Sequence, residues 1–117
     1  MPEVTAIELR QRSRTLYVEF DDGTQQELSH EFLRVYSPSA EVRGHGPGQE
    51  TLVTGKREVA VTRIEPVGNY AVMLEFSDGH NTGLYSWDYL HGIARRRDAL
   101  WEDYLQRLAQ AGAGRDA

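Results

Sequence analysis

The feature that most constrains this chain is a short pattern that occurs twice. Four residues, Phe20–Gly23, follow an alternating apolar and polar stretch, and Phe76–Gly79 follow a similar one in the second half. Alternation with a period of two predicts half-buried strands, and the glycine provides the positive φ that a tight turn needs. A second alternating stretch comes after each turn, so both halves are predicted to contain β-hairpins.

The alternation places three strands in each half. The predicted strands are Val4–Leu9, Arg14–Phe20 and Thr24–Leu28, then Glu58–Ile64, Tyr70–Phe76 and Asn81–Tyr85. Short links between them predict antiparallel meanders. Residues Pro66–Asn69 are predicted to end the strand before them, because proline and glycine interrupt regular structure.

Each predicted meander is followed by a helix that begins after a serine. Ser29 is a good N-cap for a short helix over His30–Val35, and Ser86 is a good N-cap for a second helix. From Asp98 onward, apolar residues recur at helical spacing and predict a further amphipathic helix.

The two halves resemble each other beyond the turn. Val4–Glu8 resembles Val61–Glu65, and Val18–Gly23 resembles Leu74–Gly79. A duplicated unit is the simplest account, with each copy too small to bury its apolar face alone. We therefore predict an α+β fold of duplicated antiparallel β-meander plus helix units, with an additional C-terminal helix. The strands are expected to form two sheets or one continuous sheet.

Length and composition limit the protein class. The chain has 117 residues, a net charge of −5 and no cysteine. The length predicts one domain, residues 1–110, followed by a disordered tail, residues 111–117, of small and charged residues. The sequence shows neither an apolar run of about 20 residues nor a signal peptide, so we expect a cytoplasmic protein without membrane contact.

Residues with chemical potential are scattered. His80 follows the turn at Asp78, and it is interpreted either as a turn histidine or as a metal ligand or general base. The loop Tyr36–Gln49 contains His45, and long loops in small domains often carry function. Because no nucleophile elbow, metal-ligand spacing or complete phosphate-binding loop is present, we predict no enzyme activity, no metal and no cofactor.

The basic run Arg95–Arg97 offers a third interpretation. Three adjacent arginines can bind an anionic partner such as nucleic acid. Cations at the C-terminus of a helix also interact favourably with the helix dipole, and this interpretation is preferred. No nucleic-acid partner is expected.

Three stretches resemble a known family. Leu33–Val42, Val67–Val72 and Phe76–Leu90 are similar to the gamma-butyrobetaine hydroxylase-like N-terminal domain, a bacterial domain of unknown function. Relatives occur alone, ahead of 2-oxoglutarate oxygenase domains, and attached to P-loop ATPases of iron–sulfur cluster delivery. The resemblance therefore implies an accessory module that docks on another protein or domain.

The resemblance also implies a lost metal site. In the hydroxylases this domain binds a structural zinc through three cysteines and one histidine, and the matching positions here are Ser37, Ser39, Val42 and His80. Serine hydroxyls are poor zinc ligands and valine is none, so one nitrogen remains. We expect Ser37 and Ser39 to hydrogen-bond to His80 where the metal once lay.

The functional hypothesis is a non-enzymatic accessory or protein-interaction module, linked to iron–sulfur or 2-oxoglutarate oxygenase systems. The candidate binding residues are Arg34, Ser37, Ser39, His45, Asp78 and His80. The alternative is a metal- or small-molecule-binding protein that uses His80 and the loop of residues 36–49.

Overall fold

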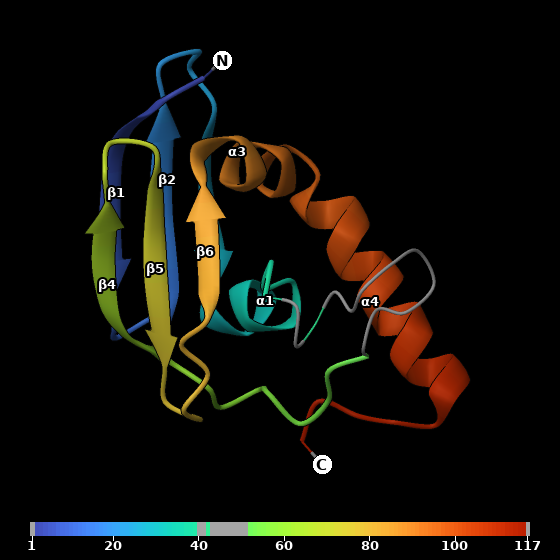
Figure 1. Cartoon of the computed structure of the whole chain (residues 1–117). Helices are drawn as coiled ribbons and strands as arrows, with labels where there is room; N and C mark the ends of the chain where they lie inside the picture. Colours follow the sequence, from blue (N-terminus) through green and yellow to red (C-terminus); the bar gives the residue numbers. More distant parts are fainter. Residues whose placement is uncertain (1, 40–41, 43–51, 117) are drawn as a thin grey trace.

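The strands form two three-stranded antiparallel sheets (Figure 1). This computed structural model describes residues 2–39, 42 and 52–116. The first sheet contains β1 (Val4–Arg10), β2 (Thr15–Phe20) and β3 (Gln25–Ser29), and the second contains β4 (Val61–Val67), β5 (Ala71–Phe76) and β6 (Gly83–Ser86). The prediction of two antiparallel meanders is confirmed, and the separate sheets resolve the choice between two sheets and one.

Each sheet is followed by a helix, and a longer helix comes after the second. These are α1 (His30–Val35), α3 (Trp87–Arg95) and α4 (Arg97–Ala111). Figure 1 shows the helices on one side of the strands, with α4 extending away from them. Among the described helices, none combines the length and apolar character needed to cross a membrane.

One hydrophobic core lies between the sheets. Along β2 and β5 every second side chain is buried in it, which is what period-two alternation predicts. The central buried residues are Leu16, Val18 and Phe20 from β2 and Val72, Leu74 and Phe76 from β5. The sheets pack together because each has one apolar face that must leave water.

The two units share the details of their construction. The ladder of β1 with β2 is irregular around Thr5, and the ladder of β4 with β5 is irregular around Thr62. Each threonine hydroxyl donates a hydrogen bond to a carbonyl oxygen of the neighbouring strand, on Glu19 and Glu75, at 3.2 Å in both cases. Such bulges bend a strand, so both sheets bend at the same point.

The turns and helix starts also match. Gly23 and Gly79 have φ angles of 88° and 89°. The hydroxyls of Ser29 and Ser86 accept hydrogen bonds from the amide three residues later, at 3.0 and 3.1 Å. Both predicted N-caps are therefore confirmed, and the predicted bounds of α1 agree with the structure.

A buried histidine joins the two units. His30 has no exposed surface; its Nδ1 accepts a hydrogen bond from the amide of Val61 at 3.0 Å, and its Nε2 donates to the carbonyl of Thr15 at 3.2 Å. Burial, together with the nearby charge of Arg14, lowers the pKa of His30. The imidazole is therefore neutral in the folded protein near pH 7.

The prediction that Pro66–Asn69 ends a strand is wrong for its first two residues. β4 continues through Pro66 and Val67, which pair with Val72 and Ala71. Since β4 is an edge strand, a missing amide hydrogen can face solvent without interrupting the ladder. The position of a strand in its sheet cannot be read from local sequence.

The described part of the predicted disordered tail packs against the domain. After α4 the carbonyls of Gly114 and Arg115 accept hydrogen bonds from the amides of Gly55 and Arg57, each at 3.1 Å. Arg115 also forms an ion pair with the buried side chain of Glu31 at 2.6 Å. These contacts are long-range, so the small and charged residues of the segment gave no sign of them.

Candidate functional site

Five of the six predicted binding residues lie close together at one end of the second sheet. Arg34 is on α1, Ser37 and Ser39 follow α1, and Asp78 and His80 lie in the turn between β5 and β6. Contacts between these segments connect the first unit to the second. His45 lies outside the described residues.

A serine and a histidine form the centre of this cluster. Ser37 Oγ lies 2.9 Å from His80 Nε2, and both side chains are buried. The expected bond between Ser39 and His80 is wrong: Ser39 Oγ instead lies 2.7 Å from Thr82 Oγ1, while its amide donates to Ser37 Oγ at 3.2 Å. The segment after α1 is thus fastened to the β5–β6 turn at two points.

Beside this pair, the Asp78 carboxylate accepts hydrogen bonds from three donors. Its carboxylate accepts hydrogen bonds from Arg34 Nε at 2.9 Å, from Lys56 Nζ at 2.6 Å and from the amide of His80 at 3.2 Å. Burial on its own would raise the pKa of Asp78, but the hydrogen bonds from Lys56, His80 and Arg34 lower it to about 2. Asp78 is therefore charged at neutral pH and anchors α1 to the turn.

The Ser37–His80 pair has the separation of a nucleophile and its base. Ser37 is buried, with no exposed surface. The oxygen of Asp78 that faces His80 accepts the backbone amide. A catalytic triad requires a carboxylate that orients the imidazole and an accessible nucleophile. The arrangement fits a structural hydrogen bond.

The donor set does not fit zinc. Val42 is buried and has no ligand atom, while the hydroxyls of Ser37 and Ser39 are engaged with each other's segment and with the β5–β6 turn. Structural zinc requires four nitrogen or sulfur donors, or carboxylates. Within 2–39, 42 and 52–116, no group of three histidine, aspartate or glutamate side chains is placed to hold a metal.

Sequence reasoning missed several members of this cluster. Thr82 and Gly83 come shortly after His80, and a Cβ atom at Gly83 would lie 2.6 Å from Ser37 Oγ. Tyr85 donates a hydrogen bond to the carbonyl of Leu33, and burial raises its pKa. The closeness of these residues to His80 in sequence was a usable signal, whereas Lys56 lies in an irregular segment with no pattern.

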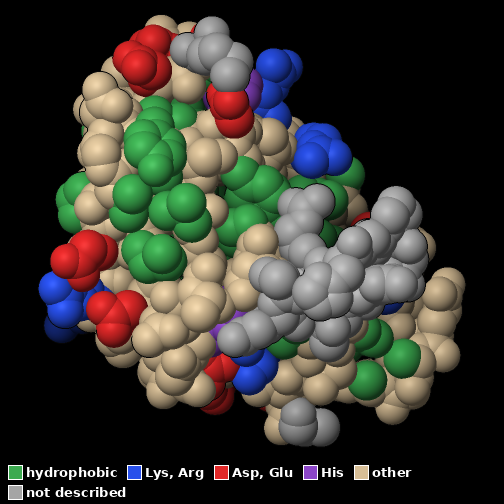
Figure 2. All heavy atoms as spheres, in the orientation of Figure 1, with side chains coloured by type: hydrophobic (Ala, Val, Ile, Leu, Met, Phe, Trp, Pro, Cys, Tyr) green, Lys and Arg blue, Asp and Glu red, His purple; other side chains and the backbone are tan. Residues whose placement is uncertain are grey.

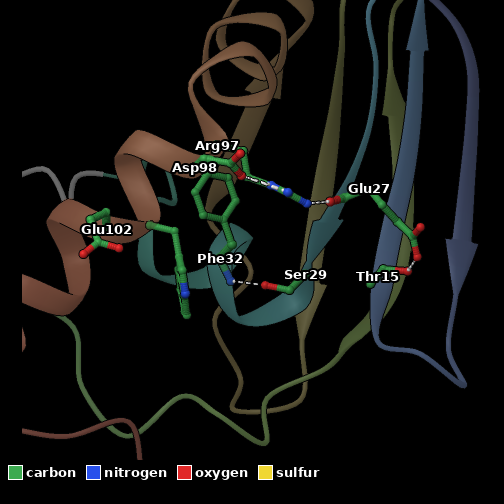
Figure 3. A pocket seen from close by; sticks show the side chains of 8 residues that line it. Thr15, Glu27, Ser29, Phe32, Arg97, Asp98 and Glu102 are labelled. Carbon is green, nitrogen blue, oxygen red and sulfur yellow. Dashed lines mark hydrogen bonds and ion pairs between the residues drawn. The ribbon is translucent and has the colours of Figure 1, made fainter.

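The basic run lies where α3 meets α4. Figure 3 shows Arg97 beside a pocket of about 510 Å³, with its guanidinium donating to Asp98 Oδ1 at 2.8 Å and to the carbonyl of Glu27 at 3.1 Å. Arg96 Nε donates to the carbonyl of Gly92 at 3.3 Å. Two of the three arginines thus have contacts within the chain, and the absence of a nucleic-acid partner stays a prediction.

The outer face of the first sheet, the face turned away from the core, is polar and internally bonded. Arg10 contacts Glu8 at 3.1 Å and Glu27 at 3.4 Å, and its guanidinium lies 4.8 Å from the ring centroid of Tyr17. The hydroxyl of Tyr17 donates to Glu19 at 2.9 Å. Polar and charged side chains satisfy one another across this face.

The outer face of the second sheet is apolar at two of the three matching positions. The row Glu8, Tyr17 and Glu27 of the first sheet corresponds to Glu65, Met73 and Leu84 of the second. Leu84 is 38% exposed, and Tyr70 in the adjoining turn is 54% exposed. Figure 2 shows hydrophobic side chains gathered over β4, β5 and β6, with charged side chains at one end.

The chain matches one family model and is similar to several solved structures. A family model described as gamma-butyrobetaine hydroxylase-like, N-terminal, matches residues 7–91. One solution NMR structure is 55% identical, with a TM-score of 0.83, and covers 98% of this chain and 86% of its own. A second is 48% identical, with a TM-score of 0.86, and covers 99% and 91%. No curated protein is a significant match.

A crystal structure is also similar to this chain. It is of a protein of unknown function in the DUF971 family from Acidithiobacillus ferrooxidans ATCC 23270, 40% identical, with a TM-score of 0.66, covering 79% of this chain and 92% of its own. The family match runs from β1 into α3 and includes Ser37, Asp78 and His80. The chain therefore belongs to the gamma-butyrobetaine hydroxylase-like N-terminal family, whose DUF971 relative has no known function.

Proposed function

We propose that this protein is a non-enzymatic protein-interaction module that docks through the outer face of its second sheet. The observation that carries this proposal is the contrast between the two outer faces. Where the first sheet has Tyr17 and Glu27 in a hydrogen-bonded network, the second has Met73 and Leu84. Exposed apolar patches bordered by polar residues are characteristic of protein–protein contacts.

The border of the patch indicates the chemistry of the partner. On the same face Arg63 contacts Glu65 at 2.8 Å and Glu75 at 3.6 Å, so two carboxylates share one guanidinium. The remaining negative charge repels an identical face and attracts a basic one. The occupant is therefore a different folded protein, with an apolar surface bordered by lysine or arginine.

The absence of catalysis in this proposal is supported by the buried Ser37–His80 pair. Ser37 has no exposed surface, and the Asp78 carboxylate accepts hydrogen bonds from Arg34 and Lys56. The cluster instead fastens α1 to the second sheet. The family resemblance adds partner candidates, namely 2-oxoglutarate oxygenase domains and proteins of iron–sulfur cluster delivery.

The test replaces two apolar side chains of the second sheet by the side chains found at the matching positions of the first sheet. Met73→Tyr combined with Leu84→Glu gives the second sheet the row found in the first, so we expect the fold to persist. Gln25→Glu, on the outer face of the first sheet, adds a carboxylate as a matched control. Circular dichroism checks that all variants are folded.

Proteins captured from source-cell extract are identified and purified, and their affinities are measured by calorimetry. We expect at least one basic protein to bind the wild type and the Gln25→Glu variant equally and the double variant at least about tenfold more weakly. Equal binding by the wild type and both variants contradicts the proposal. A dimer that sediments in ultracentrifugation and is lost in the double variant assigns the face to a second copy instead.

A further inference from the structure

A second candidate site lies among the helices. A cavity of about 750 Å³ is lined by the end of α1 and the residues after it, including Ser37, and by Val42, Leu52, α3 and α4. Ligand pockets commonly measure about 300–1,000 Å³ and are mostly apolar with a few polar groups. This volume is suited to a small molecule.

The walls of the cavity are apolar and fixed in place. Val35 and Ile93 are buried and Leu100 is half-buried. The hydroxyl of Tyr36 donates to the carbonyl of Leu100 at 2.7 Å, and the hydroxyl of Tyr89 donates to the carbonyl of Tyr36. Because both tyrosine rings are held by backbone contacts, a ligand finds the walls already ordered.

The charged residues of the lining favour an anion. Arg96, Asp103 and Arg107 line the cavity, so its described walls carry one more positive than negative charge in a chain of net charge −5. Arg107 Nε pairs with Asp103 at 3.1 Å, and Arg107 Nη2 donates to the Tyr36 hydroxyl at 3.1 Å. These bonds hold the Arg107 guanidinium beside the apolar walls.

We propose that this cavity binds a small amphipathic anion, with an apolar acyl or aromatic body against Val35, Ile93 and Leu100 and a carboxylate, sulfonate or phosphate near Arg96 and Arg107. The body is withdrawn from water, which provides the driving force, and the anionic group is paired with a guanidinium. The inference does not depend on the proposed docking face, which lies on the strands.

Two probes test the site: the dye 8-anilinonaphthalene-1-sulfonate, followed by fluorescence, and decanoate, followed by calorimetry. We expect saturable binding of both, with amide NMR shifts concentrated at Tyr36, Tyr89 and Ile93. Neutral 1-decanol should bind at least about tenfold more weakly than decanoate, because it lacks the charge. Shifts that map elsewhere, equal binding of the alcohol, or no saturable binding overturn the proposal.

Matched variants separate the cavity from general electrostatics. Arg96→Glu should weaken decanoate binding about tenfold or more, while Arg95→Glu, at the neighbouring last residue of α3 and outside the described lining, should change it less than about twofold. Leu100→Trp fills the cavity and should abolish binding, while Ala99→Trp, exposed on the same helix, should not. Equal effects within either pair contradict the proposal.

A final competition distinguishes the cavity from the docking face. If decanoate displaces the captured protein, that protein occupies the cavity, and the assignment of the cavity to a small molecule is wrong. If decanoate binds while the Met73→Tyr and Leu84→Glu changes leave its affinity unchanged, the cavity is an independent site. Loss of protein binding therefore leaves decanoate binding measurable, and the reverse also holds.

Discussion

The two sheets are built alike on the inside and differently on the outside. Their bulges, turns and serine caps match, and both contribute alternate side chains to one core. Their outer faces differ: Arg10, Tyr17 and Glu27 interact on the first, while Met73 and Leu84 are unmatched apolar residues on the second. The comparison teaches that matching strands, turns and caps can support outer faces of different chemistry.

The substitution with the largest expected effect on stability removes the hydrogen bonds of His30 that connect the two units. His30→Ala removes the acceptor for the Val61 amide and the donor to the Thr15 carbonyl, and it leaves both groups buried. We expect the free energy of unfolding to fall by about 3 kcal/mol, from the unpaired groups and the cavity left behind. Urea unfolding followed by circular dichroism measures it.

His91→Ala is the comparison variant for this change. His91 contacts Asp22 at 2.7 Å in a partly exposed pair, and such pairs contribute about 1 kcal/mol or less. If the two histidine variants lose the same stability, His30 does not connect the units in the way its contacts indicate.

The same histidine predicts how stability depends on pH. Burial lowers the pKa of His30 in the folded state below the value of about 6.5 of an unfolded chain. As pH falls below about 6.5 the unfolded state binds more protons than the folded state, so stability decreases. The decrease should be smaller in His30→Ala than in the wild type between about pH 5 and 6.5. Parallel curves for both proteins contradict this assignment.

Alanine substitutions at two corresponding glycines test whether the turns of the two units are equivalent. Gly23 and Gly79 have φ angles of 88° and 89°, and an added Cβ would meet nothing within 4 Å at either position. Gly23→Ala and Gly79→Ala should therefore each cost about 1–2 kcal/mol, through backbone conformation alone. Values that differ by more than about 1 kcal/mol show that the turns are not equivalent.

Gly92→Ala supplies a control of opposite sign. Gly92 lies inside α3, and the nearest atom to its added Cβ is 3.9 Å away, on Arg96. Alanine is favoured over glycine in a helix by about 0.5–1 kcal/mol, so this variant should be slightly more stable than the wild type.

The last comparison concerns the helix caps. Ser29→Ala and Ser86→Ala each remove a hydroxyl that accepts a hydrogen bond from the first turn of a helix, and each should cost about 1 kcal/mol. Ser13→Ala, in the exposed turn after β1, should change stability by less than about 0.5 kcal/mol. A cost confined to one cap indicates that one helix contributes little to the core.

Local patterns predicted most of the fold. Leu16, Val18 and Phe20 alternate with polar residues and are buried, and Ser29 and Ser86 begin helices, because these features depend only on neighbours in the chain. The continuation of β4 through Pro66 was missed because it depends on β4 being an edge strand. The packing of residues 112–116 was missed because the contact of Arg115 with Glu31 is long-range.

The candidate site was predicted in part. The family resemblance brought Ser37 and His80 together, and the structure places them 2.9 Å apart. Lys56 was missed because an irregular segment brings it to Asp78. The apolar outer face was missed because alternation in β6 shows that Leu84 and Tyr85 point to opposite sides, without showing which side is the core.

The bond between His30 and Val61 also determines how the protein opens. Amides of an edge strand usually exchange with deuterated water early, because a small local opening exposes them. The amide of Val61, at the first residue of edge strand β4, is hydrogen-bonded to a ring from the other unit. We therefore expect deuterium to reach the Val61 amide only when the two halves separate, so that this end of the strand bordering the apolar face exchanges as slowly as the core.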